Sequence, residues 1–353
     1  MENLLNYDRA ALAGFFERRG CKPYRAEQVF RRLHRGEDPP AAFADLPRVL
    51  RNELIAETAS PPLPAVSDST AADGVRKWLF DIGDGRIETV LIPETSRRTL
   101  CISSQAGCAL ACRFCLTGKQ GFSRNLSAAE IIGQLRRANM AEDRPATNVV
   151  LMGMGEPLLN LDAVLPALSM MTDPLGYALA PRRVTVSTAG IVPAMARLTA
   201  EANVSLAVSL HAPTDELRDS LMPINRKYPL SALLAACRRH LQTRPRAFIT
   251  FEYVMLRGVN DSPSRARELI RLLHGLRCKV NLIPFNIFAG APYLPSSADT
   301  IAAFRAALVK SGVMTTIRKT RGDDILAACG QLAGEVRART MGLGGAPVAG
   351  PGA

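Results

Sequence analysis

The sequence lacks the features of a membrane or secreted protein. No apolar run is long enough to span a bilayer, and the first residues, Met1-Glu2-Asn3-Leu4-Leu5-Asn6, do not form a basic stretch followed by an apolar core. There is also no internal repeat, and no long low-complexity segment before residue 341. We therefore expect a cytoplasmic globular protein without a membrane partner, and 353 residues allow one large domain and a small one.

Lysine is scarce, although the chain is strongly basic. Only seven of the 44 basic residues are lysines, the other 37 are arginines, and the net charge is +12. An excess of positive charge favours a polyanionic partner, because cationic side chains release counterions when they meet phosphates. This points to nucleic acid. An arginine-rich composition is also what a GC-rich genome encodes, so pairs such as Arg31-Arg32 and Arg182-Arg183 are equally compatible with solvated helix faces.

Eight cysteines without a secretion signal indicate thiols that bind metal or do chemistry. Three of them, Cys108, Cys112 and Cys115, have C-x3-C-x2-C spacing, which supplies one thiolate fewer than a [4Fe–4S] cluster has irons. The open iron suits the amine and carboxylate of S-adenosylmethionine. The alternatives are a zinc loop or three core thiols, but zinc sites usually close four ligands and nothing nearby completes the set.

The pattern along the chain predicts an α/β protein. Residues 1–60 read as helical, and residues 61–98 hold a Pro-rich linker and a hairpin around Gly83-Asp84-Gly85. From residue 99 to 334, apolar strands alternate with helices, which predicts a partial (β/α)6 TIM-like barrel. The strands are expected at 100–103, 148–153, 183–187, 204–210, 248–255 and 280–284. The Gly-, Ala- and Pro-rich end of the chain, within 335–353, is expected to be disordered.

Active residues of such a barrel lie just after the strands. The cysteine loop follows the first strand, and Glu156 follows the second, where its carboxylate suits the cationic amine of S-adenosylmethionine. Small hydroxyls, an imidazole and an amide follow later strands and suit a ribose, a carboxylate and an adenine edge; His211 is equally compatible with a satisfied core histidine. The candidate cofactor-binding residues are Gly155, Glu156, Ser187, Ser209, Leu210, His211 and Asn286.

These motifs together resemble those of a known family. The cysteine triplet is typical of the radical-SAM superfamily. Cys101 in Thr99-Leu100-Cys101-Ile102-Ser103, the segment Gly153-Met154-Gly155-Glu156-Pro157, and Cys329 in Arg321-Gly322-Asp323-Asp324-Ile325-Leu326-Ala327-Ala328-Cys329 resemble the 23S rRNA adenine-C2 methyltransferases called RlmN. The similarity runs from about residue 76 to 334, while residues 1–60 match only as a helical accessory domain. It implies a barrel of the radical-SAM type.

The resemblance also implies roles for single residues. Cys329 accepts a methyl group from one S-adenosylmethionine, and a radical made from a second one activates that methyl group. Glu88 removes the C2 proton, and Cys101 resolves the protein–RNA cross-link by forming a transient disulfide with Cys329. Considered alone, Glu88 is a single carboxylate on a strand, and it either faces solvent or is placed there for a functional role. Cys101 and Cys329 also allow burial in the core, which is the reading preferred for Cys21, Cys237 and Cys278.

The partners implied are 23S rRNA, tRNA at the adenine next to the anticodon, and a one-electron reductase of the flavodoxin or ferredoxin type; a monomer is expected. Arg113 and Leu116 depart from the family pattern without removing a cluster ligand. Two alternatives stay open. One is the sister activity that methylates carbon 8 of the same rRNA adenine, and the other is a noncatalytic Fe–S or zinc protein that binds RNA. Cys101 and Cys329 would be redundant in a protein that only binds RNA, which argues against this second alternative.

Overall fold

The computed structural model describes residues 1–334, so the predicted disordered tail lies outside the described residues. Its centre is a ten-stranded sheet in the order β14-β13-β12-β11-β10-β9-β6-β5-β4-β3. Seven neighbouring strands of this sheet are parallel: β6 (Arg98–Cys101), β9 (Asn148–Leu151), β10 (Val184–Thr188), β11 (Ser205–Ser209), β12 (Ile249–Met255), β13 (Cys278–Pro284) and β14 (Met314–Ile317). The predicted α/β class with a partial barrel is confirmed.

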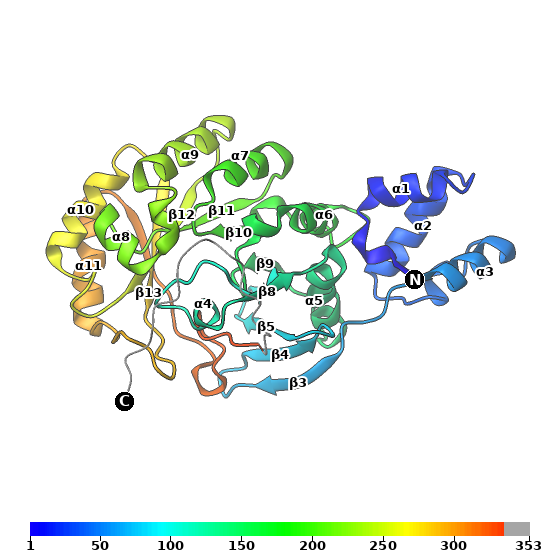
Figure 1. Cartoon of the computed structure of the whole chain (residues 1–353), viewed down its shortest axis with the longest axis horizontal. Coiled ribbons are helices and arrows are strands. Elements are labelled where there is room, and N and C mark those ends of the chain that lie inside the picture. The colour runs from blue at the N-terminus through cyan, green and yellow to red at the C-terminus, as the bar shows by residue number, and fades with distance from the viewer. Residues whose placement is uncertain (335–353) are drawn as a thin grey trace, which may run out of the picture.

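The parallel strands are joined by helices that cover the outside of the sheet (Figure 1). The six expected strands lie within two residues of their predicted bounds, and the edge strand β14 was not predicted because its run Met314-Thr315-Thr316-Ile317 is short and mostly exposed. The covering helices are α5 (Ala128–Met140), α6 (Leu161–Thr172), α7 (Val192–Glu201), α8 (Asp215–Leu221), α9 (Leu230–Thr243), α10 (Pro263–Leu273) and α11 (Ala298–Lys310).

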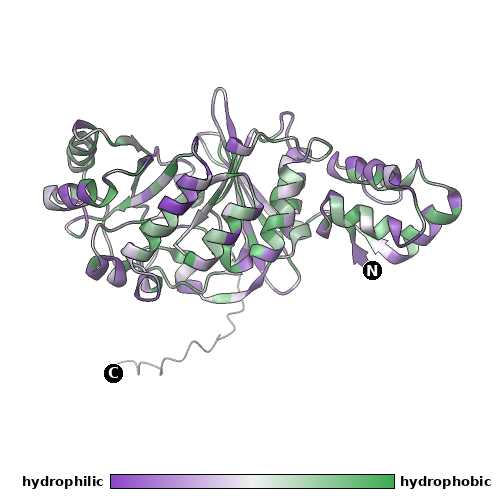
Figure 2. Cartoon of the chain, turned by 90° about the horizontal axis from the view of Figure 1, so that it is seen from above, coloured by the Kyte–Doolittle hydropathy of each residue, from purple (hydrophilic) through white to green (hydrophobic). Residues whose placement is uncertain are grey.

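The two faces of the parallel sheet differ in polarity because side chains alternate along each strand. Val149, Leu151, Val186, Leu206 and Val208 point to the helices and are fully buried. The opposite face lines an open cleft of about 1410 Å³, where the barrel does not close. Apolar strand residues such as Val150, Ala207 and Ile283 also line this cleft, but more of its strand residues are polar: Thr99, Asn148, Thr185, Ser205, Thr250, Glu252, Lys279, Asn281 and Thr316. Figure 2 shows the same mixture of apolar strands and helices with hydrophilic outer faces.

An antiparallel extension continues the sheet beyond β6. The hairpin expected around Gly83 consists of β4 (Arg76–Asp81) and β5 (Arg86–Pro93), and β5 pairs with β6. A further strand, β3 (Ala65–Thr70), pairs with β4 and occupies part of the segment expected to be a linker. The turn from β3 to β4 thereby contacts Arg321 and Asp324 in the carboxyl-terminal part of the chain.

The N-terminal helices form a separate layer at one side of the barrel (Figure 1). These are α1 (Arg9–Glu17), α2 (Pro23–His34) and α3 (Arg48–Glu57), and the two-residue strands β1 (Glu2–Asn3) and β2 (Thr58–Ala59) pair with each other. The layer docks on α5 and α6 through ion pairs of Arg136 with Asp38 and of Arg9 with Asp173, each 2.8 Å. No helix in the described part of the chain is both long and apolar enough to cross a membrane.

Candidate active site

The three motif cysteines line one cavity at the carboxyl ends of the strands. Their loop runs from β7 (Gln105–Gly107) to α4 (Leu116–Gln120), and β8 (Phe122–Asn125) returns beside β7. A hydrogen bond of 2.8 Å from the Cys108 N–H to the Gly121 carbonyl closes the loop. Cys108, Cys112 and Cys115 are free thiols, and all three line a cavity of about 170 Å³.

This donor set fits an iron–sulfur cluster better than a single ion. Among residues 1–334 no three His, Cys, Asp or Glu side chains are placed as ligands of one metal ion. Cysteines that bind different irons of a cube lie farther apart than ligands of one ion, so a shared cavity is the relevant test for a cluster. Burial raises the pKa of Cys108 to about 12, and the neighbouring thiols Cys108 and Cys115 add to the effect of burial on Cys112. Without a metal these thiols keep their protons, and bound iron is what would deprotonate them.

Glu156 also lines the cavity, in the loop that follows β9, and its charge acts on Cys108 and Cys112. Its Oε2 accepts a 2.7 Å hydrogen bond from the Ala189 N–H, and its Oε1 accepts one of 3.1 Å from the Leu158 N–H. Burial raises the pKa of Glu156 to about 7, and these hydrogen bonds oppose the shift. Gly155 brings the backbone close, because it has φ +97° and an added Cβ would be 2.5 Å from the Gln105 Cβ. A buried carboxyl without a cationic partner is suited to an amine of a ligand.

Of the five other residues predicted to bind the cofactor, four line the cavity and one does not. Ser187, Ser209, His211 and Asn286 line the cavity, whereas Leu210 does not. Leu210 is fully buried, and its N–H and carbonyl bond to the Glu252 carbonyl and the Arg218 Nε.

His211 is both a core residue and a cavity residue. Its Nδ1 accepts a 3.0 Å hydrogen bond from the Val254 N–H, and its ring contacts Phe114 edge to face. Burial and the charge of Arg218 lower the pKa of His211 to about 3, so its imidazole is neutral. The backbone at His211 has φ +59°, a conformation rare for residues other than glycine.

Arg218 is the main site residue that the sequence did not reveal. It is fully buried on α8, just outside the cavity, and no carboxylate of the described chain forms an ion pair with it within 4.0 Å. Its guanidinium donates to the carbonyls of Ala189 (2.7 Å), Ser209 (2.8 Å) and Leu210 (3.1 Å), and to Asn225 Oδ1 (2.9 Å). Arg218 therefore ties together the ends of two strands that line the cavity. In sequence it is one charged residue of Asp215-Glu216-Leu217-Arg218-Asp219, which reads as an ordinary exposed helix.

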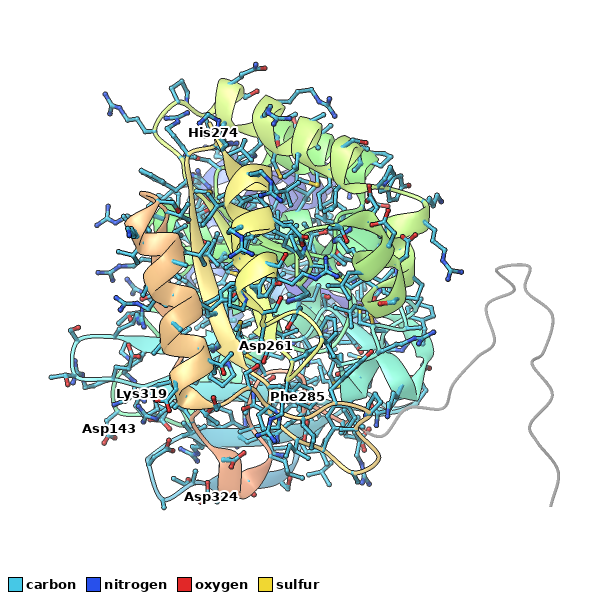
Figure 3. The ribbon with its side chains drawn as sticks, turned by 90° about the vertical axis from the view of Figure 1, so that its left-hand side faces the viewer. Asp143, Asp261, His274, Phe285, Lys319 and Asp324 are labelled. Carbon is cyan, nitrogen blue, oxygen red and sulfur yellow. The ribbon has the colours of Figure 1, made fainter. Side chains whose placement is uncertain are left out.

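Cys329 lies in the segment 318–334, which follows β14 and returns across the carboxyl end of the barrel. It lines both the small cavity and the open cleft, and the Asn286 Nδ2 donates to its carbonyl at 3.1 Å. In Figure 3, Phe285, Lys319 and Asp324 lie toward the same end of the barrel, and His274 lies at the other end. Phe285 directly follows β13, so its end of the barrel is the one where the parallel strands have their carboxyl ends. Cys329 thus shares the cavity of the three motif cysteines.

Cys101 ends β6 and is 5% exposed. Burial and the nearby Cys329 thiol raise its pKa to about 12, and the charge of Arg318 opposes this. Cys329 therefore lies within electrostatic range of Cys101, and both thiols are free. Of the cysteines expected in the core, Cys237 is fully buried. Cys21 and Cys278 are only half-buried and pack against the edge of the core, because each lies near the end of a helix or strand.

Glu88 is buried on β5 and faces neither solvent nor the cavity. Its carboxylate is 3.0 Å from the Lys77 Nζ and accepts a 2.8 Å hydrogen bond from the Ala333 N–H. It therefore holds the end of the Cys329 segment, and it lines neither the cavity nor the cleft.

Comparisons with known proteins agree with this geometry. The model of the radical SAM superfamily matches residues 102–272, and that of the ribosomal RNA large subunit methyltransferase N-terminal domain matches residues 2–59. A solved radical SAM methyltransferase from Sphaerobacter thermophilus is 44% identical with a TM-score of 0.87, and the match covers 94% of this chain and 99% of that one. A domain of pyruvate-formate lyase-activating enzyme from Bacteroides vulgatus is 16% identical with a TM-score of 0.40, over 49% of this chain and 100% of that one.

Proposed function

The chain belongs to the RlmN-like radical SAM methyltransferases, and from this we propose that it methylates carbon 2 of an adenine in 23S rRNA and of the adenine next to the anticodon in tRNA. The observation that carries the proposal is that Cys329 and the three motif cysteines line one cavity, with Cys101 in electrostatic range of Cys329. A methyl-accepting thiol is useful only beside the group that activates the methyl.

Both cofactors are proposed to bind in this cavity. Cys108, Cys112 and Cys115 would hold a [4Fe–4S] cluster, and Glu156 would hold the amine of S-adenosylmethionine. When bound, these groups supply a 5′-deoxyadenosyl radical after one electron arrives from a reductase of the flavodoxin or ferredoxin type. Such chemistry is needed because adenine C2 is an electron-poor sp² carbon, which does not attack a methyl sulfonium.

The chain's own residues then carry the methyl group, and two molecules of S-adenosylmethionine are used per turnover. The Cys329 Sγ loses its proton and accepts a methyl group from the first. That methyl would give a hydrogen atom to the 5′-deoxyadenosyl radical, and the carbon radical left on Cys329 forms a bond to adenine C2. Release of one electron to the one-electron centre that the three motif cysteines would hold, and of the C2 proton, for which Glu88 is the proposed acceptor, restores the aromatic ring and leaves protein and RNA joined.

Cys101 is proposed to release the product. Its thiolate attacks the Cys329 Sγ, so that an S–S bond forms, the S–CH2 bond breaks, and the methylene takes up a proton to become the methyl group. Burial and the neighbouring Cys329 raise the pKa of Cys101 to about 12, so the thiol must lose its proton before it attacks. Arg318 is the charge that favours its deprotonation.

RNA is proposed to approach through the open cleft, because Cys329 lines both the cleft and the cavity. The cleft carries many cations but only two carboxylates, Glu94 and Glu252. Its basic residues are Arg97, Arg182, Arg244, Arg246, Lys279, Arg318, Lys319 and Arg321. This charge suits a phosphate backbone. The helical layer at residues 1–60 is proposed to add to RNA docking.

The test is nucleoside mass spectrometry of 23S rRNA and tRNA from a strain that lacks the gene. We expect 2-methyladenosine to be absent from both RNAs and restored by the wild-type gene but not by a Cys329→Ala gene. Restoration in rRNA alone would remove tRNA from the proposal. A product methylated at carbon 8 would instead assign the sister activity, and unchanged RNA in the deletion strain would refute the proposal.

A further inference from the structure

The turn between β3 and β4 holds the segment that carries Cys329. Asp73 lies in this turn, and its Oδ2 accepts hydrogen bonds from the Arg321 Nε at 2.5 Å and from the Gly322 N–H at 3.2 Å. The Arg321 Nη2 also donates to the Asp73 carbonyl at 2.7 Å. One acidic side chain therefore fixes two consecutive residues that lie 248 and 249 positions away in the sequence.

The contact is reciprocal, and it is closely packed. The Ala72 N–H donates to the Asp324 Oδ2 at 3.0 Å, so the turn binds the segment as well as being bound by it. Gly322 has φ +65°, and an added Cβ would be 2.8 Å from the Cγ1 of the fully buried Val75. Only glycine allows this approach. We call the contact of residues 71–75 with residues 321–324 the Asp73 dock.

Beyond Cys329 the segment is fixed a second time, on the cluster loop. The Leu116 N–H donates to the Gly330 carbonyl at 2.8 Å, and the Thr117 hydroxyl donates to the Leu332 carbonyl at 2.6 Å. Cys329 thus lies between the Asp73 dock on the antiparallel extension and the loop of the three motif cysteines, and Asn286 and Lys77 add single hydrogen bonds to the Cys329 and Leu326 carbonyls. A thiol held from both sides has a defined place at the cavity, whereas a thiol held from one side swings with the free part of the chain.

We propose that Asp73 is a positioning residue, which holds Arg321 and Gly322 so that the Cys329 thiol stays at the cavity it shares with the cluster cysteines. This gives the extension β3–β5 a part in the reaction, although no atom of Asp73 lines the cavity. The inference rests on the proposed function for its effect on turnover, but its effect on the Cys329 thiol does not depend on the reaction.

The electrostatics of the dock agree with this role. Burial acts to raise the pKa of Asp73, but the hydrogen bonds from Arg321, Val75 and Gly322 outweigh it, and the pKa lies below its usual value. A depressed carboxyl pKa means that the dock holds at neutral pH and weakens only as the pH falls through that lowered value.

The experiment compares Asp73→Ala, Asp73→Asn and a matched control in anaerobically purified protein with its cluster. Asp162→Ala is the control, because Asp162 also pairs with an arginine, Arg197, at 2.5 Å but lies on α6 far along the chain from the segment. Peptide mass spectrometry follows the rate at which iodoacetamide labels Cys329. We expect labelling to rise several-fold in Asp73→Ala, less in Asp73→Asn, which keeps an acceptor, and not at all in Asp162→Ala.

Turnover provides the second measurement. The kcat with RNA should fall about 10- to 100-fold in Asp73→Ala, because a displaced reacting group costs that much, while the KM for RNA and the iron content stay near wild-type values. If Asp73→Ala fails to fold, Asp324→Ala removes the acceptor of the Ala72 N–H and tests the same dock from the segment side, at a residue that lines neither the cavity nor the cleft. Wild-type labelling and turnover in these variants, or equal changes in Asp162→Ala, would overturn the inference. A wild-type protein that does not methylate RNA would refute the proposed function instead, and the labelling result would still decide the role of Asp73.

Discussion

The buried guanidinium of Arg218 allows a quantitative prediction. Replacing Arg218 with methionine keeps much of the side-chain volume but removes the donors to four acceptors, the carbonyls of Ala189, Ser209 and Leu210 and the Asn225 Oδ1. A buried acceptor left without a partner costs about 1 to 3 kcal/mol. Even at the lower limit, the free energy of unfolding should fall by about 4 kcal/mol. The melting temperature should then fall by about 5 °C, because the entropy of unfolding grows with chain length.

The same change should weaken cofactor binding, because Ala189 and Ser209 line the cavity. Calorimetry would measure unfolding and the affinity for S-adenosylmethionine, at a temperature where the variant is folded. Arg136→Met is the matched control: Arg136 is also buried and donates to the Leu33 carbonyl and to Asp38, but it holds the N-terminal layer and not the cavity. Arg136→Met should lose stability and keep its affinity. If Arg218→Met keeps wild-type affinity, or melts within a degree or two of the wild type, the role assigned to Arg218 is wrong.

Four further outcomes are expected. Replacing Cys108 with alanine should abolish the absorption of a [4Fe–4S] cluster, whereas stoichiometric zinc and no iron in the native protein would exclude the radical reaction. Cys101→Ala should accumulate a covalent protein–RNA species that survives denaturation, and this species should be absent from Cys329→Ala and from the double variant; normal turnover by Cys101→Ala would contradict the assigned order. RNA binding should weaken steeply with salt and weaken further when residues 1–60 are removed, and unchanged affinity after removal would make this layer purely structural. Burial raises the pKa of Glu156 to about 7, so its carboxyl is protonated below that pH and the affinity for S-adenosylmethionine should increase as the pH rises through about 7. The variant Glu156→Gln should lose this pH dependence. A wild-type affinity that does not change with pH would contradict the assignment.

Local patterns carried the sequence prediction of the barrel. Strand positions could be predicted because buried parallel strands are continuous apolar runs, such as Asn148–Leu151, and each has its own helix after it. Cavity residues could be predicted for a related reason. The ends of parallel strands meet at one edge, so residues such as Glu156 and Ser209 share a cavity although 53 positions separate them.

Contacts that depend on tertiary packing could not be predicted. Arg218 looks like any charged residue of a short helix, and only the fold turns it inward beneath two strand ends. Asp73 looks like a turn residue before Gly74, and nothing in its neighbourhood points to Arg321. The strand β3 was missed because Ala65–Thr70 is almost entirely exposed, so it has no apolar face to reveal it. Leu210 was assigned to the cofactor from its place beside His211, but alternation along the chain directs it to the core.

Glu88 connects the proposed proton transfer to the position of the Cys329 segment. Its carboxylate accepts the Ala333 N–H and faces Lys77, and the Lys77 Nζ also donates to the Leu326 carbonyl at 3.3 Å. One buried pair therefore contacts the segment on both sides of Cys329. Because Glu88 lines neither the cavity nor the cleft, its carboxylate reaches the C2 proton only if the residues after Cys329 move, which breaks the bond to Ala333 and leaves the charge of Glu88 compensated by Lys77. The residues after Cys329 would then move when the base acts, while the Asp73 dock keeps the residues before it in place.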